Sequence, residues 1–162
     1  MKKINNPFGP ATEQGDYNCF GCSPSNEIGV HLDFWEDGEY LVAKWMPEKK
    51  FEGWMGVLHG GIQATLMDEM AAWVVFIKLQ TAGVTSGMQV KYTKPVYISK
   101  GQITVRGSLV AVEKRMAKID CILFDGEGKN CANARVEYYV FPEKIARKKY
   151  MYPGIEAFLP SI

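Results

Sequence analysis

Residues 60–80 are the feature that most limits how this chain can fold. The stretch contains no proline, keeps its glycines at its start and is rich in residues of high helix propensity, so we predict one long helix. Its apolar residues occur on most faces of that helix instead of along a single stripe. Such a helix has to be covered on several sides by other elements.

The segments on either side of this helix have the pattern of β-strands. Val, Ile, Thr and Tyr dominate them, and a hairpin is predicted at Asp37-Gly38. The predicted strands are residues 28–35, 39–46, 88–98, 102–113, 116–125 and 130–141. Pro95 indicates a sheet edge or a bulge at its position. Two strands, one long helix and four more strands indicate an α+β fold in which an antiparallel sheet curls around the helix.

The length and composition fit one domain. The chain has 162 residues, of which 47% are hydrophobic and 23% are charged, as is usual for a globular protein with a core. We expect a single domain over residues 1–162. Residues 1–27, rich in Gly, Pro and Asn, should be irregular, and the tail 142–162 should hold a short helix.

Charge and hydropathy narrow the class of partner. The net charge is +1 and the basic residues are scattered, which does not favour nucleic-acid binding. There is no run of about 18 apolar residues that would cross a membrane. The N-terminal lysines are not followed by the apolar core of a secretory signal. We therefore expect a cytoplasmic protein with neither a nucleic-acid nor a membrane partner.

Two of the four cysteines, Cys19 and Cys22, form a C-x-x-C pair. Cys121 and Cys131 lack the spacing of a second zinc knuckle. The Gly, Ser, Pro and Asn residues around the pair indicate a loop, whereas a thioredoxin-like redox motif needs a strand-to-helix junction. We expect two reduced thiols in a turn, with no metal and no cofactor. A zinc knuckle is the alternative.

Two adjacent acids interrupt the apolar helix. Asp68 shares one face of the helix with small residues, which would let another molecule or segment approach that face. Glu69 lies on a different face. A carboxylate on a buried helix is unfavourable unless something satisfies it, and such groups often carry out chemistry. From the residues alone, Asp68 is either a reactive group or a hydrogen-bonding partner of a loop or of a second subunit.

The helix begins with the bare backbone of Gly60 and Gly61, directly after His59. The first N–H groups of a helix lack internal partners and carry the positive end of its dipole. Glycines let a ligand oxygen reach these donors, which would stabilise charge on a carbonyl oxygen. Asp68 lies ~10 Å further along the axis, so an acid and a glycine pair from two subunits would have to face each other. Close packing of the helix on the sheet is the other explanation of the glycines.

Residues 51–73, "FEGWMGVLHGGIQATLMDEMAAW", resemble the signature of hotdog-fold acyl-CoA thioesterases, in the branch of the phenylacetyl-CoA and 4-hydroxybenzoyl-CoA types. The flanking segments "NCFGCSPSNEIGVHL" and "MQVKYTKPV" are also similar, so the resemblance covers roughly residues 17–141. It implies a hotdog fold, in which a five- to six-stranded antiparallel sheet wraps one long central helix. It also implies self-association as a homodimer or as a homotetramer of two dimers.

The resemblance also implies a role for each motif residue. Asp68 takes the position of the catalytic acid, as general base or nucleophile. Gly61 takes the position of the oxyanion donor beside Gly60, and His59 would orient the thioester or the loop, unless it is only a structural cap. Ala72 stands where some members hold a water-binding Ser or Thr. The candidate substrate-binding residues are Thr65, Gln63, Ser86, Gly87 and Met88.

The function implied is hydrolysis of an acyl-CoA thioester to a free acid and CoA at a dimer interface, with CoA as part of the substrate. A non-catalytic acyl-CoA-binding module is a second possibility, although residues 1–27 are too short and too rich in Gly and Pro for a helix-turn-helix. Hydration of an enoyl-CoA is a third. In that branch an Asp and a His lie a few residues apart, whereas here His59 precedes Asp68 across the glycine pair.

Overall fold

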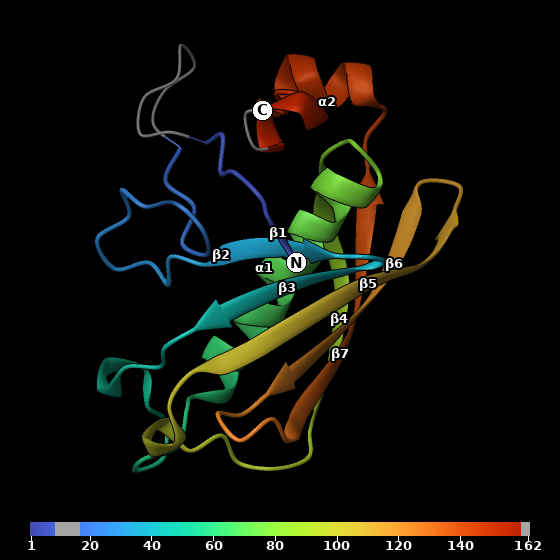
Figure 1. The fold of residues 1–162 in the computed structure, drawn as a ribbon. Helices are drawn as coiled ribbons and strands as arrows, with labels where there is room; N and C mark the ends of the chain where they lie inside the picture. Colours follow the sequence, from blue (N-terminus) through green and yellow to red (C-terminus); the bar gives the residue numbers. More distant parts are fainter. Residues whose placement is uncertain (9–16, 160–162) are drawn as a thin grey trace.

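One antiparallel sheet curves around a single long helix. The computed structural model describes residues 1–8 and 17–159. Helix α1, Gly60–Lys78, lies in the concave side of a seven-stranded sheet, so that strands cover it from several directions (Figure 1). This confirms the predicted α+β hotdog architecture, and the helix ends within two residues of its predicted end. The sheet has seven strands where five or six were expected, because the short β1 joins it.

The strand order across the sheet is β1-β2-β3-β5-β6-β7-β4, and all neighbours are antiparallel. The strands are β1 Lys2–Lys3, β2 Asp33–Asp37, β3 Tyr40–Trp45, β4 Gly83–Tyr92, β5 Ile103–Glu113, β6 Met116–Phe124 and β7 Asn130–Val140. The shorter helices are η1 Lys49–Phe51, η2 Ile98–Lys100, α2 Glu143–Lys149 and η3 Ile155–Phe158. The hairpin predicted around Asp37-Gly38 is confirmed as β2–β3, but its two turn residues are Gly38 and Glu39, since Asp37 still pairs with Tyr40.

The two ends of the chain differ in part from prediction. β1 lies within the segment 1–27 that we expected to be irregular, and residues 9–16 of that segment fall outside the described part of the chain. In the tail 142–162 the short helix is confirmed as α2; its last three residues are likewise not described.

Two predicted strand starts are wrong. β2 begins five residues later than predicted, because His31 adopts a positive φ of 53°, which interrupts extended backbone. β4 begins at Gly83, five residues before the predicted start, and ends before Pro95. A register shift between Thr85 and Gly87 lets the strand continue through a glycine that the pattern indicated as a break.

The core forms between α1 and the inward faces of the strands. Nine residues of α1 are buried: Gln63, Leu66, Met67, Met70, Ala71, Trp73, Val74, Val75 and Ile77. The Trp73 ring stacks on Phe34 of β2 with 4.2 Å between centroids. At the C-terminal end of α1, the Tyr152 hydroxyl donates to the Phe76 carbonyl at 3.1 Å, and the segment after α2 closes that end of the core (Figure 1).

Gly107 marks the closest approach of β5 to α1. A Cβ at this position would lie 2.6 Å from Met70 Cγ and 3.1 Å from Val74 Cγ2. We expect Gly107→Ala to lower the free energy of unfolding by about 1–3 kcal/mol, because a packed core has no room for the added methyl group. Urea unfolding measures the change.

Gly87→Ala is the matched control for Gly107→Ala, since the nearest atom to its new Cβ would be 3.7 Å away. Its free energy of unfolding should stay within about 0.5 kcal/mol of the parent chain. Equal stability of Gly107→Ala and the parent chain would contradict the close packing of β5 on α1.

Candidate functional site

The first turn of α1 presents backbone N–H groups at the end of the sheet. His59 caps the helix: its Nδ1 accepts a hydrogen bond from the Gly61 N–H at 2.9 Å, so this nitrogen carries no proton. Within residues 1–8 and 17–159, the N–H groups of Gly60 and Ile62 have no hydrogen-bond partner. The Gly61 N–H expected to bind the oxyanion is therefore engaged by His59, while the N–H groups of Gly60 and Ile62 have no partner among the described residues.

β4 reaches this turn at its end. The Tyr92 hydroxyl donates to the Gly60 carbonyl at 2.7 Å, and a Cβ on Gly60 would lie 3.4 Å from the Tyr92 ring. The Thr65 hydroxyl donates to the Gly61 carbonyl at 2.9 Å, one turn back along the helix. Side-chain hydroxyls thus hold the carbonyl groups of Gly60 and Gly61. The backbone N–H groups of this turn are left for a ligand.

Two hollows flank the helix start, and His59 lines both. The larger, of about 550 Å³, is also lined by Gly60, Gln63 and Lys94; the smaller, of about 360 Å³, by Gly61 and Thr65.

Gln63, which lines the larger hollow, is 4% exposed. Its Nε2 donates to the Leu58 carbonyl at 2.9 Å, but its Oε1 is buried without a partner among the residues described. A buried acceptor left unpaired costs about 1–3 kcal/mol.

Asp68 lies two turns further along α1, beside β4. Its Oδ1 accepts a hydrogen bond from the Thr85 hydroxyl at 2.8 Å. The Tyr138 hydroxyl shares its single proton between this oxygen, at 3.4 Å, and the Asp68 main-chain carbonyl, at 3.3 Å. Burial raises the pKa of Tyr138, which keeps this hydroxyl protonated as a donor. The other oxygen, Oδ2, has no partner in the described part of the chain, and Asp68 is only partly buried. One oxygen is held in place and the other is left open, which suits a general base or a nucleophile.

The sequence did not single out Thr85 or Tyr138. Thr85 lay in a predicted loop because β4 was predicted to start at residue 88, and Tyr138 is 70 residues from Asp68 in the chain. Of the three weaker candidates on β4, Ser86 is exposed at the register shift, Gly87 pairs with Glu137, and Met88 packs against the core.

β4 is the last strand of the sheet. It pairs with β7 over its length, and no described strand pairs with its other edge. Its start contacts Asp68 through Thr85, and its end contacts Gly60 through Tyr92. One open sheet edge therefore runs from the carboxylate to the helix start.

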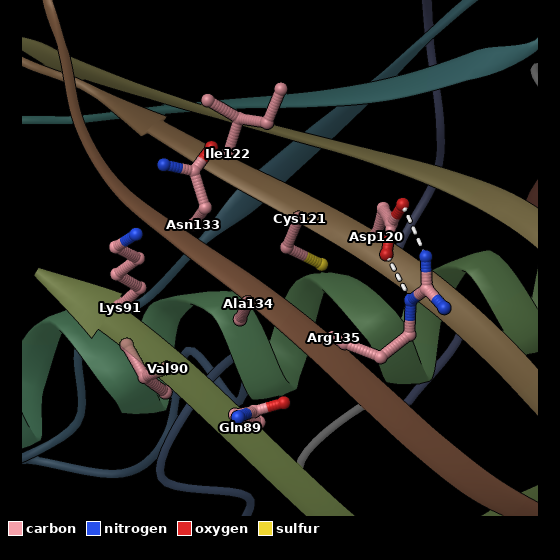
Figure 2. Close-up of a pocket in the computed structure, with 9 residues that line it drawn as sticks. All are labelled: Gln89, Val90, Lys91, Asp120, Cys121, Ile122, Asn133, Ala134 and Arg135. Carbon is pink, nitrogen blue, oxygen red and sulfur yellow. Dashed lines mark hydrogen bonds and ion pairs between the residues drawn. The ribbon is translucent and has the colours of Figure 1, made fainter.

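A third cavity, of about 510 Å³, lies at the face of β4, β6 and β7 that points away from α1 (Figure 2). Lys91, Asn133 and Arg135 project from the strands on this side (Figure 2). Arg135 forms an ion pair with Asp120, with 2.9 Å between Nη2 and Oδ2. None of the predicted site residues lines this cavity, so we do not include it in the candidate site.

Sequence comparisons connect this site to a family. A model of the thioesterase superfamily matches residues 55–132, the stretch that contains His59, both glycines and Asp68. A protein of Saccharolobus solfataricus named "Putative esterase SSO1253" is 28% identical over 119 residues, which are 73% of this chain and 77% of that protein. No helix in the described ranges is both long and apolar enough to span a membrane.

Solved structures share the fold at low sequence identity. RHA08564, a thioesterase superfamily protein, has a TM-score of 0.67 at 19% identity; the match covers 75% of this chain but 62% of that one, which is less than two thirds of its length. A hypothetical thioesterase of Streptococcus pneumoniae TIGR4, solved with coenzyme A, has a TM-score of 0.63 at 22% identity, covering 69% of this chain and 87% of that one. The protein smu.793 of Streptococcus mutans UA159, bound to acetyl CoA, has a TM-score of 0.64 at 19% identity, covering 74% and 98%. The chain thus matches the thioesterase superfamily model over residues 55–132, and it shares its fold with these solved structures.

Proposed function

We propose that this chain hydrolyses acyl-CoA thioesters to the free acid and CoA. The superfamily match and the related folds solved with CoA or acetyl CoA support this class of substrate. The observation that carries the proposal is the Asp68 carboxylate, which has one oxygen held by the Thr85 and Tyr138 hydroxyls and the other oxygen open.

In the proposed reaction, Asp68 Oδ2 takes a proton from a water molecule as that water attacks the thioester carbonyl carbon, or attacks the carbon itself. The carbonyl oxygen gains negative charge, and N–H groups at the start of α1 receive it. The C–S bond then breaks. On the general-base route the CoA sulfur takes the proton that Asp68 accepted from water, and the free acid is released. On the nucleophile route the acyl group remains on Asp68 as an anhydride, which a water molecule hydrolyses to the free acid and the Asp68 carboxylate, while the proton released from that water goes to the CoA thiolate. For Gly61 to act as a donor, the His59 ring has to turn away from its N–H, whereas Gly60 needs no rearrangement.

The proposed site is completed by a second copy of the chain. In one chain, Asp68 and Gly61 are seven residues apart on the helix, or ~10 Å. Because β4 contacts Asp68 at its start and Gly60 at its end, antiparallel pairing of two β4 edges would bring the start of one strand beside the end of the other. Asp68 of one protomer would then face the helix start of its partner.

The hollows at the helix start suit the CoA part of the substrate. A small turn of the buried Gln63 side chain, which lines the larger hollow, would let its unpaired Oε1 accept an amide N–H of the pantetheine arm. Lys94 in the larger hollow and Lys50 in the smaller one would meet CoA phosphates.

A binding module that does not cleave acyl-CoA is the second candidate, and one observation favours it. The Gly61 N–H already donates to His59, so the oxyanion site is incomplete in the single chain. Thermal stabilisation by CoA esters without release of CoA would identify this function.

Replacing Asp68 should separate these two functions. We expect Asp68→Asn to lower kcat by about 10²–10⁴-fold with little change in KM, because the amide cannot accept the proton from water. Release of CoA from short-chain, long-chain and aryl thioesters, followed with a thiol reagent, measures this. Asp120→Asn, which changes an acid on the outer face of the sheet, is the control and should keep parental kcat. Undiminished kcat in Asp68→Asn would remove Asp68 from the mechanism.

Thr85 should act as a positioning residue for Asp68. Thr85→Val keeps the shape of the side chain but removes the hydroxyl, and we expect kcat to fall about tenfold, which corresponds to one hydrogen bond to a charged group. Thr85→Ser keeps the hydroxyl and should restore most of kcat. Equal kcat in the Val and Ser variants would show that the contact with Asp68 does not matter for the reaction.

Mixing two inactive variants tests whether the site spans two protomers. Asp68→Asn and Gly61→Val should each be inactive alone. After the subunits are exchanged, each mixed dimer would hold one intact site, so activity should return to roughly a quarter of the parental value for a random mixture. Failure to regain activity, with mixed dimers verified by mass spectrometry, would place both groups in one chain.

A further inference from the structure

Two thiols and a carboxylate join the N-terminal loop, residues 17–32, to the middle of α1. Cys19 Sγ, Cys22 Sγ and a carboxylate oxygen of Glu69 lie within 4.8 Å of one another. Cys19 Sγ is 3.4 Å from Glu69 Oε2. The expected turn at the C-x-x-C pair is confirmed, but its contact with Glu69 had no signal in the sequence. The proposed hydrolysis uses none of these three groups.

The surrounding chain holds the three groups in this arrangement. The Gly21 N–H donates to Cys19 Sγ at 3.3 Å, and Trp73 Nε1–H donates to Glu69 Oε1 at 3.1 Å. Outer partners of this kind orient the ligands of metal sites. A Cβ on residue 21 would lie 2.4 Å from Glu69 Cδ, so the loop can close on the carboxylate only with glycine there.

The cluster contains acidic groups and lacks a cation. Cys22 is 2% exposed, and in the described part of the chain Glu69 takes part in no ion pair. The Tyr17 hydroxyl, 3.6 Å from Cys22 Sγ, adds another acidic group. Two thiols and a carboxylate that converge with no cation beside them among the described residues form a donor set that suits a metal ion.

We propose that Cys19, Cys22 and Glu69 bind one thiophilic divalent cation, of which Zn²⁺ is the best match. Zinc accepts thiolate and carboxylate ligands, and Zn–S and Zn–O bonds of usual length at a tetrahedral angle place sulfur and oxygen about 3.5 Å apart. The 3.4 Å between Cys19 and Glu69 agrees with that spacing. Water or the Tyr17 hydroxyl would take the fourth coordination position of the ion. The ion fastens the N-terminal loop to α1 at the residue next to Asp68.

Metal content tests this directly and does not depend on thioesterase activity. The full chain, purified under reducing conditions without chelator, should hold about one zinc per chain by elemental mass spectrometry. Co²⁺ added to the metal-free chain should produce thiolate-to-cobalt charge-transfer absorption. Removing the metal should lower Tm, and added Zn²⁺ should restore it.

Variants assign the ligands. Glu69→Gln and Cys19→Ser should each weaken zinc affinity by at least about tenfold. Cys131→Ala changes a buried thiol outside the cluster and should keep parental affinity, which controls for general loss of fold. Unchanged affinity in Glu69→Gln would overturn the three-ligand site. So would a parental chain that binds neither zinc nor cobalt, or one that only forms a Cys19–Cys22 disulfide.

Discussion

Burial of α1 inside the curved sheet is the constraint on which the rest of the structure depends. Because the helix is apolar on most faces, the sheet has to bend around it, and the chain closes its far end with the segment after α2. Polar groups of the helix can then be reached at few places. Two such places are the Asp68 carboxylate and the N–H groups at the helix start that have no partner in residues 1–8 and 17–159.

The sequence predicted those elements whose signals are local. The long helix, the hairpin around Asp37-Gly38 and the strands after residue 100 follow from apolar periodicity and turn residues, and all are confirmed. The start of β4 was wrong because a glycine at a register shift reads locally as a break. Only pairing with β7, distant in sequence, turns that segment into strand.

The site residues also divide into those with a local sequence signal and those that depend on distant parts of the chain. The motif pointed to His59, Gly60, Gly61 and Asp68, whose positions on one helix follow from its period. It could not show that His59 binds the Gly61 N–H, or that Thr85 and Tyr138 hold Asp68, since those contacts depend on loop geometry and on strands far away in the chain. Glu69 was expected only to point away from Asp68; besides Trp73 on the same helix, its partner is Cys19 of a loop about 50 residues earlier.

The neighbouring acids Asp68 and Glu69 have a mechanical consequence. Successive residues on an α-helix are about 100° apart around its axis, so the two carboxylates leave the helix in different directions. One is tied to β4 and the other to the N-terminal loop. Rotation of α1 about its own axis in either direction would lengthen at least one of these two contacts. Together they fix the rotation of the helix at the point where the proposed chemistry takes place.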